Sequence, residues 1–215
     1  MGKAYIITYI KLVYKGRSSM VDFKNSETKK NLMRAFAGES QARNRYEFAA
    51  SVAKKEGYSI LQDLFNYTAN QEKAHAKEFM KKLKDFSGEE IVITAGYPAE
   101  SGENTLSLLK LATEHENAEH DEIYKNFAEV AEKEGFKDIA ILFEKIASIE
   151  KVHANRFAKY AKELENNSLF KNETKMQWMC TNCGYIYEGN GAPEACPVCL
   201  HPKGFFMEFE NTPFE

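Results

Sequence analysis

The sequence Glu150-Lys151-Val152-His153 lies in the middle of a long helical pattern. Apolar residues recur on both sides of it at steps of three and four, which predicts a helix with one buried face. Glu150 and His153 fall on that face. A carboxylate in a helical core costs roughly several kcal/mol of desolvation unless a partner compensates its charge, and a metal ion is one such partner. The apolar positions of the face are Ile139, Leu142, Phe143, Ile146, Ile149, Phe157, Tyr160 and Leu164.

The same pattern occurs earlier as Glu72-Lys73-Ala74-His75, and a shift of 78 residues aligns Tyr46–Phe79 with Tyr124–Phe157 without a gap. This is an internal repeat of a helical hairpin. A Glu and a His three residues apart project from the same side of a helix, with Cβ atoms about 5–6 Å apart. Each hairpin therefore offers one oxygen and one nitrogen ligand to a shared centre, and two copies predict two metal ions.

The composition limits the class of protein. With 215 residues, 43% of them hydrophobic, the chain is long enough for one good core and a small second domain. The net charge of -3 provides no basic field of the kind that nucleic-acid binding requires, and no apolar run approaches membrane-spanning length. We expect a soluble protein with no nucleic-acid or membrane partner.

Residues 1–22 differ from the rest of the chain and contain a β-branched and aromatic run from Tyr5 to Tyr14. A signal peptide is disfavoured because Lys11 interrupts the apolar stretch and no small-residue cleavage site follows. The preferred interpretation is a translated leader ahead of a start at Met20, and the alternative is a short strand or a frayed tail. We assign this N-terminal extension no function.

The first predicted hairpin begins at Ser26, a plausible N-cap, and its first helix runs to about Glu56. Gly57 ends that helix, and the second helix carries Glu72 and His75 on its apolar face. Between residues 86 and 104 the helical period disappears and glycines and a proline occur, which predicts a long crossover with an extended piece at Ile91–Ile93.

The second hairpin is expected to contain a third helix from about Thr105 to Glu134 and a fourth helix from Gly135 to about Leu164. The inner face of the third helix is predicted to include Ile123, Phe127 and Val130. The polar segment from 165 to 175 is typical of a linker. Two hairpins joined by one long crossover predict a mainly α protein with a ferritin-like four-helix bundle at 23–168, followed by a small domain at 169–215.

Seven residues are predicted to face the middle of this bundle at matched depths. Taken singly, each histidine is better explained as a hydrogen-bonded core residue and each glutamate as one whose carboxylate reaches solvent. Together, the buried carboxylates would repel one another and raise one another's pKa, whereas two metal ions would neutralise them. The seven candidate ligands are Glu39, Glu72, His75, Glu116, Glu119, Glu150 and His153.

The donor types favour iron, or manganese, over zinc or copper because oxygen ligands outnumber the two imidazoles. Two non-haem irons are the first choice. Bridging carboxylates in such bundles come from the helices that also supply a histidine, so Glu72 and Glu150 are expected to bridge the metals. Glu39 and Glu116 would then be terminal ligands, and Glu119 would be a surplus carboxylate.

The four cysteines form two Cys-x-x-Cys pairs separated by twelve residues: Cys180, Cys183, Cys196 and Cys199. Without a secretory signal, this spacing indicates a tetrahedral four-thiolate metal site rather than disulfides, and hence the cytoplasm. By spacing alone a structural zinc ribbon is the more frequent answer. Gly184, which allows close backbone approach to sulfur, and an aromatic shell favour iron. That shell comprises Trp178, Tyr185, Tyr187, Phe205 and Phe206.

The segment Phe36-Ala-Gly-Glu-Ser-Gln-Ala-Arg-Asn-Arg-Tyr46, the two Glu-x-x-His sequences and the Cys-Gly-Tyr and Cys-Pro-x-Cys-x-His-Pro sequences together resemble the rubrerythrin family. The resemblance covers residues from about 25 to 210 and implies that the C-terminal domain is rubredoxin-like, with one iron bound by four cysteines. Leu200 departs from free-standing rubredoxins, which usually have glycine there. The N-terminal extension lies outside the family pattern.

The resemblance implies a peroxidase of anaerobic or microaerophilic cells that reduces hydrogen peroxide to water at the di-iron site. It implies that a rubredoxin or an NAD(P)H-dependent reductase donates electrons through the rubredoxin-like iron, and that the protein is a homodimer whose two kinds of iron centre pair between subunits. It also places Tyr46 and Tyr124 beside the site as hydrogen-bonding or proton-supplying groups. Glu119, whose counterpart in the repeat is Gln41, would exchange with His75 at one iron as the oxidation state changes.

Two other functions compete with this interpretation. A ferroxidase or oxygen-scavenging bundle would use the same bundle ligands but has no evident need for the four cysteines. A non-catalytic metal-sensing or interaction protein would carry a zinc ribbon at the cysteines. Metal analysis and an absorption spectrum of the purified protein distinguish these possibilities.

Overall fold

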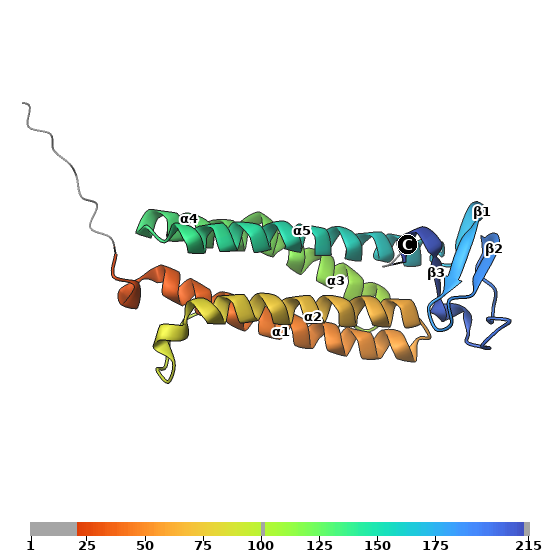
Figure 1. The fold of residues 1–215 in the computed structure, drawn as a ribbon, viewed down its shortest axis with the longest axis horizontal. Helices are drawn as coiled ribbons and strands as arrows, with labels where there is room; N and C mark the ends of the chain where they lie inside the picture. The colour runs from red at the N-terminus through yellow and green to blue at the C-terminus, as the bar shows by residue number, and fades with distance from the viewer. Residues whose placement is uncertain (1–20, 100–101, 213–215) are drawn as a thin grey trace, which may run out of the picture.

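A computed structural model describes residues 21–99 and 102–212 of the chain, as an elongated helical bundle with a small group of strands at one end (Figure 1). The predicted mainly α fold is confirmed. The predicted extension at 1–22 lies outside the described residues, apart from its last two. The helices are α1 (Glu27–Lys55), α2 (Ser59–Lys82), α3 (Thr105–Ala118), a π-helical turn (Glu119–Ile123), α4 (Tyr124–Glu134) and α5 (Lys137–Glu165).

The first and last helices begin and end close to where the sequence predicts. Ser26 caps α1 because its Oγ accepts a hydrogen bond from the backbone nitrogen of Lys29 at 3.0 Å. Helix α1 ends at Lys55 rather than Glu56, and α5 ends at Glu165 rather than Leu164. Both differences are within the range over which helix ends fray.

Two Glu-Gly pairs of the repeat, Glu56-Gly57 and Glu134-Gly135, explain how the hairpins are joined. Both glycines have a positive φ, 83° and 93°, which ends a helix without a side-chain clash. The Glu134 carboxylate accepts hydrogen bonds from the first two backbone N–H groups of α1, at 3.0 and 2.8 Å. The Glu56 carboxylate accepts one from the first N–H group of α3, at 3.1 Å. Each hairpin therefore caps the other.

The predicted third helix is not one continuous α-helix, because a π-helical turn at Glu119–Ile123 separates α3 from α4. A π-helical turn adds one residue to a helix and rotates everything that follows. After the turn the predicted inner face is wrong at Ile123, which is 39% exposed, whereas Phe127 packs against the core as predicted. The fully buried positions there are Tyr124, Ala128 and Ala131. The repeat contains the reason. Tyr46 follows Glu39 by seven positions, but Tyr124 follows Glu116 by eight.

The metal-ligand candidates lie between two apolar cores. One core contains Phe65, Leu109 and Phe157, and the other contains Leu32 and Phe143. Along each hairpin the candidate ligands lie between residues of one core and residues of the other. The site is therefore a polar layer with aliphatic and aromatic side chains packed on both sides of it along the bundle. Such layers exclude bulk water and strengthen the electrostatic interactions inside them.

The crossover after α2 is irregular through the described residues up to 99, and Ile91–Ile93 forms no strand there. Two hydrogen bonds hold it against α1: Arg34 Nε donates to the carbonyl oxygen of Thr94 at 3.0 Å, and the Tyr97 hydroxyl donates to the carbonyl oxygen of Arg34 at 2.8 Å. The crossover thereby covers α1 next to the layer that contains Glu39.

The C-terminal domain is an antiparallel sheet of β1 (Lys171–Cys180), β2 (Ile186–Gly191) and β3 (Phe206–Glu208), in the order β2-β1-β3. Its core contains the fully buried side chains of Trp178 and Phe206. The predicted linker is too long, because β1 already begins at Lys171. The first half of β1 is exposed and polar, so it lacks the apolar alternation by which a strand is recognised in sequence.

The C-terminal domain packs on the turn between α1 and α2, at the end of the bundle (Figure 1). A Cβ atom added to Gly204 would lie 1.7 Å from the carbonyl oxygen of Gly57, so the two backbones meet without room for a side chain. The rings of Tyr58 and Phe170 stack with centroids 6.4 Å apart. The four cysteines are therefore held at a fixed end of the bundle.

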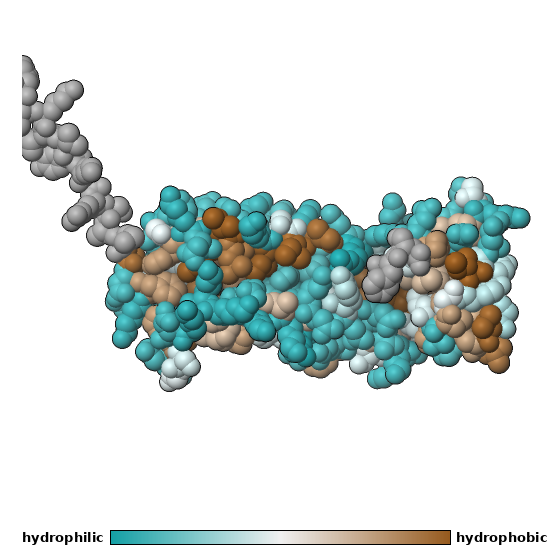
Figure 2. All heavy atoms as spheres, viewed as in Figure 1, coloured by the Kyte–Doolittle hydropathy of each residue, from teal (hydrophilic) through white to brown (hydrophobic). Residues whose placement is uncertain are grey.

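The face drawn in Figure 2 is mainly hydrophilic, with apolar residues gathered over the part of the bundle formed by α4 and α5. On α5 the exposed aliphatic residues include Ile141, Ile149 and Val152. In the described parts of the chain, none of the helices has both the length and the apolar composition needed to cross a bilayer.

Candidate metal centres

Six of the seven predicted bundle ligands form two donor groups that share Glu72 and Glu150. Within each group, one donor atom per residue lies within 4.8 Å of all the others, and every member is buried. The residues come from four helices, α1, α2, α3 and α5, so the groups exist only when both hairpins are packed together. The first group is Glu39, Glu72, His75 and Glu150, and the second is Glu72, Glu116, Glu150 and His153.

The two shared carboxylates each face both histidines. Glu72 Oε2 lies 3.0 Å from His75 Nδ1, and Glu72 Oε1 lies 3.1 Å from His153 Nδ1. Glu150 Oε1 lies 3.0 Å from His75 Nδ1, and Glu150 Oε2 lies 2.8 Å from His153 Nδ1. Each carboxylate thus directs one oxygen to each donor group, which is the arrangement a bridging ligand requires.

The two outer carboxylates are each held by a tyrosine from the opposite half of the repeat. The Tyr124 hydroxyl donates to Glu39 Oε1, and the Tyr46 hydroxyl donates to Glu116 Oε1. The other oxygens, Glu39 Oε2 and Glu116 Oε2, each lie 3.7 Å from the Nδ1 atom of the nearer histidine. Each outer glutamate therefore has one oxygen engaged and one free, as expected of a terminal ligand.

Eight buried side-chain atoms of these two groups have no hydrogen-bond partner. Buried polar groups without partners are rare, and each costs about 1–3 kcal/mol or more when charged. Two metal ions would satisfy all eight, so the residues fit the two-metal site that the sequence predicts. The atoms are Glu39 Oε2, both carboxylate oxygens of Glu72 and of Glu150, Glu116 Oε2, and the Nδ1 atoms of His75 and His153.

Electrostatics in the metal-free site favour protons where metals would bind. Burial raises the pKa of Glu39 to about 8, against the lowering effect of His75. Burial would also raise the pKa of Glu72, but its contacts with His153 and His75 hold it at about 2. Burial disfavours the charged form of His153, yet contacts with Glu116 and the two shared carboxylates raise its pKa to about 11. Metal ions would displace these protons.

Glu119, the seventh predicted ligand, lies beside the two donor groups rather than within them. It is half-buried at the start of the π-helical turn, and a Cβ atom added to Gly38 would lie 3.9 Å from Glu119 Oε1. Burial, followed by the charge of Glu39, raises its pKa well above the ordinary value. Glu119 also lines an open pocket of about 370 Å³, together with Tyr97 and Tyr124.

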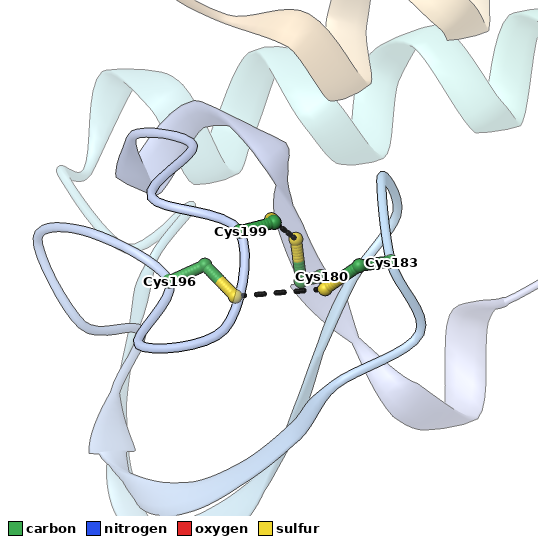
Figure 3. Close-up of side chains that lie close together, drawn as sticks. All are labelled: Cys180, Cys183, Cys196 and Cys199. Atoms are coloured by element: carbon green, nitrogen blue, oxygen red, sulfur yellow. Dashed lines mark hydrogen bonds between the residues drawn. The ribbon is translucent and has the colours of Figure 1, made fainter.

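The four cysteines converge in the C-terminal domain, as Figure 3 shows. The Sγ atoms of Cys180 and Cys199 are 3.7 Å apart, and those of Cys183 and Cys196 are 3.6 Å apart. Sulfurs at about 2.3 Å from one tetrahedral metal lie about 3.8 Å from one another, so the spacing fits a tetrathiolate site. The predicted use of all four cysteines is supported by this geometry.

The two cysteine turns have the same backbone although only one contains glycine. Gly184 has φ 76° and its nitrogen donates to the carbonyl oxygen of Cys180 at 2.8 Å. Leu200 has φ 62° and its nitrogen donates to the carbonyl oxygen of Cys196 at 2.9 Å. The departure from glycine at this position therefore keeps the turn, at the steric expense of a left-handed leucine.

Comparisons with known proteins agree with both halves of this description. The rubrerythrin family profile matches residues 30–161, and the profile described as the rubredoxin-like domain of rubrerythrin matches residues 178–207. A rubrerythrin from Clostridium perfringens is 47% identical over 194 residues, covering 90% of this chain and 100% of the relative. The chain belongs to the rubrerythrin family. The two donor groups are accordingly the family's di-iron site, and the four thiolates are its rubredoxin-like iron site.

Other members of the rubrerythrin family match over nearly the whole chain. A rubrerythrin from Nitratidesulfovibrio vulgaris is 43% identical over 187 residues, covering 87% of this chain and 96% of the relative. Fully reduced nigerythrin superposes with a TM-score of 0.57 at 26% identity, covering 96% of this chain and 98% of that one. The likeness in sequence and fold thus extends over both domains.

Sequence reasoning missed two features of the site. The first is the π-helical turn, which the extra residue between Glu116 and Tyr124 could have revealed. The second is Gln71, whose Oε1 lies 3.0 Å from His153 Nε2. Gln71 directly precedes Glu72, at the edge of the apolar face, where a polar side chain usually faces solvent but can also contact a buried ligand. No signal in a single sequence distinguishes the two cases.

Proposed function

We propose that this protein is a non-haem di-iron peroxidase that reduces hydrogen peroxide to water. One peroxide takes up two electrons and two protons to give two waters, and two ferrous ions held by the two donor groups would supply the two electrons. The observation that carries the proposal is the presence in one chain of a buried two-metal donor set and a four-thiolate site. A single thiolate-bound iron relays one electron at a time and so suits the return of electrons to the bundle.

The protein's own residues would place the substrate and keep the protons available. The pocket beside Glu119 leads toward Tyr124 and is open to solvent, which offers peroxide a route to the site. Burial, followed by the charge of Glu116, raises the pKa of Tyr46 well above the ordinary value, and burial with Glu39 does the same for Tyr124. Both hydroxyls therefore stay protonated and able to donate.

Glu119 and His75 would exchange as ligands of one iron between the oxidised and reduced states. Oxidation adds positive charge to the site, and a hard carboxylate favours that state more than a neutral imidazole does. The position of Glu119 beside Gly38, next to Glu39, supports exchange in the donor group that contains His75. The alternative to ligand exchange is that Glu119 accepts hydrogen bonds beside the site and never binds a metal.

Electrons would reach the bundle from a second subunit. The C-terminal domain packs at the α1–α2 turn, and Glu72 lies thirteen residues along α2 from Ser59, which is about 20 Å at the rise of an α-helix. A homodimer that pairs the cysteine site of one subunit with the bundle site of its partner would shorten this path. The exposed aliphatic residues of α5 offer an apolar contact for such a dimer. A rubredoxin or NAD(P)H-dependent reductase in the cytoplasm would then reduce the cysteine site.

Steady-state turnover of the iron-loaded protein tests the proposal. With a reductase and NAD(P)H present, hydrogen peroxide should drive continuous NAD(P)H oxidation, and Cys183→Ser should abolish it. The same variant should still allow one oxidation of its pre-reduced bundle irons by peroxide. A ferroxidase or oxygen scavenger would instead turn over with ferrous ion or O2 regardless of Cys183. Zinc in the bundle of protein from iron-replete cells would contradict any enzymatic role.

A further inference from the structure

The two histidines of the bundle differ in what holds the ring nitrogen that points away from the metals. His153 Nε2 lies 3.0 Å from Gln71 Oε1, a side chain of α2 that reaches across to α5. In residues 21–99 and 102–212, no hydrogen bond is made to Nε2 of His75, which is 7% exposed. Because the repeat relates these two histidines, this is a difference between equivalent positions of the two halves.

The orientation of the Gln71 amide is fixed by two further contacts. Arg156 Nη1 donates to Gln71 Oε1 at 3.3 Å, and Gln71 Nε2 donates to the Tyr67 hydroxyl at 3.4 Å. The Arg156 guanidinium also lies 5.3 Å from the centroid of the Tyr67 ring. A reversed amide would point its NH2 group at the arginine donors, so Oε1 faces His153.

This orientation determines the tautomer of His153 in the metal-loaded protein. Since Gln71 Oε1 can only accept, His153 Nε2 must carry the proton. Nδ1 is then left with a lone pair directed at Glu72 and Glu150, between which a metal would bind. Hydrogen bonds of this kind hold the ring of a metal-bound histidine and raise its basicity.

At the equivalent position, the other half of the repeat has no side chain that could accept a hydrogen bond from His75. The residue 78 positions after Gln71 is Ile149, which is 37% exposed and has no side-chain acceptor. The counterpart of Arg156 is Glu78. His75 is therefore held within the described residues only through Nδ1 and ring packing, such as its stacking on His153 at a centroid distance of 5.7 Å.

We propose that Gln71 is a positioning residue that locks His153 onto its metal, and that Ile149 at the matching position leaves His75 as the histidine free to exchange. The carboxylate that would replace it, Glu119, lies beside Gly38, which directly precedes Glu39 of the donor group that contains His75. The exchange itself rests on the proposed function, whereas the anchoring of His153 is a property of the metal-loaded protein and needs no turnover.

Proton exchange in the zinc-loaded protein tests the anchoring. In spectra of protein labelled with 15N at histidine, the Nε2 proton of His153 should exchange with solvent more slowly than that of His75. Gln71→Leu should remove the protection, and Gln71→Glu, which keeps an acceptor for His153 and Arg156, should retain it. The matched variant Ile149→Gln should confer protection on His75. Gln71→Leu should also weaken binding of one of the two bundle zinc ions by about tenfold to a hundredfold.

Equal protection of both histidines in the natural protein, or protection of His153 that survives Gln71→Leu, would overturn the anchoring. The role of Ile149 is tested by crystal structures of the iron-loaded Ile149→Gln variant in both oxidation states. His75 should stay bound to its iron in both. If His75 still exchanges there as it does in the natural protein, Ile149 is not what frees it. If peroxide is not a substrate, the zinc measurements stand unchanged, so failure of the function and failure of the anchoring are distinguishable.

Discussion

Tyr46 on α1 donates a buried hydrogen bond to Glu116 on α3, across the boundary between the two halves of the repeat. The Tyr124 hydroxyl on α4 donates the equivalent hydrogen bond to Glu39 on α1. Each half therefore orients a terminal carboxylate of the other, and neither donor group is complete in a single hairpin. The two hairpins have to pack before any metal can be bound with the full set of ligands.

Tyr46→Phe should leave Glu116 Oε1 as a buried acceptor without a donor. We expect a loss of about 1–3 kcal/mol in the free energy of unfolding of the zinc-loaded protein, measured by denaturant titration, together with slower peroxide turnover. Tyr124→Phe is the matched variant and should behave alike, since its bond to Glu39 is related by the repeat. An unchanged stability in both variants would show that these hydroxyls do not hold the outer carboxylates.

Glu119→Ala should still assemble two bundle irons but turn over peroxide more slowly. Six residues already provide the two donor groups without Glu119, so its loss should leave the metal content, measured by elemental analysis, unchanged. Glu119→Gln keeps the shape and removes the charge, and it should slow turnover as well. Wild-type rates in both variants, or identical ligands to both irons in oxidised and reduced crystals, would refute the exchange of Glu119 with His75.

The metal-free bundle should lose stability as the pH rises from 5 to 8. By pH 5 the unfolded chain has already released most of the Glu39 proton, and it releases the histidine protons over this range, whereas in the folded state the pKa of Glu39 is about 8 and the pKa values of both histidines are raised. The folded state therefore binds more protons, and the free energy of unfolding falls with pH. The depressed pKa of Glu72 acts in the opposite sense only between about 2 and 4.5, below this window.

Thermal unfolding followed by helical circular dichroism measures this dependence. In the metal-free protein the midpoint should fall from pH 5 to pH 8, and Glu39→Gln should flatten the slope. With excess zinc the midpoint should instead rise over the same range, because metal binding releases the ligand protons. A metal-free midpoint that rises with pH would mean that the buried carboxylates are already ionised.

Leu200→Gly should stabilise the C-terminal domain. A left-handed conformation costs a side-chain-bearing residue about 1–2 kcal/mol relative to glycine, and Leu200 is 79% exposed, so little packing is lost. The single tryptophan, Trp178, lies in the core of this domain, so its fluorescence reports the unfolding. Gly184→Ala, at the equivalent turn, should destabilise by a similar amount. A less stable Leu200→Gly protein would show that Leu200 makes a contact that outweighs the strain.

Helical spacing predicts much of the site because burial and ligation share one face of each helix. Glu39, Glu72 and Glu150 are recognisable as polar residues on apolar stripes, and the structure brings them together with Glu116 and the two histidines. Cysteine spacing works for a similar reason, since two short turns determine the geometry of four sulfurs. In both cases local sequence fixes the direction in which a side chain points.

Features that depend on a change of helical register or on a cross-helix contact are not predictable in this way. The π-helical turn leaves the residues before Glu119 in place and rotates those after it, so Ile123 faces outward although its spacing predicts the core. Gln71 acquires its role from His153, which is 82 residues away in sequence. At the start of β1, Lys171 pairs with Gly191, the next paired residue is Met176, and the exposed residues between them carry no apolar period.

The most direct test of the account is a single turnover without any reductase. Fully reduced, iron-loaded protein is mixed anaerobically with hydrogen peroxide, or with O2 in a parallel experiment, while the oxidation of the bundle irons is followed by absorbance. We predict that peroxide oxidises each pair of bundle irons with consumption of one peroxide, and does so faster than O2 at equal concentration. Faster oxidation by O2, or bundle irons that peroxide leaves reduced, would contradict the assignment of peroxide as the substrate.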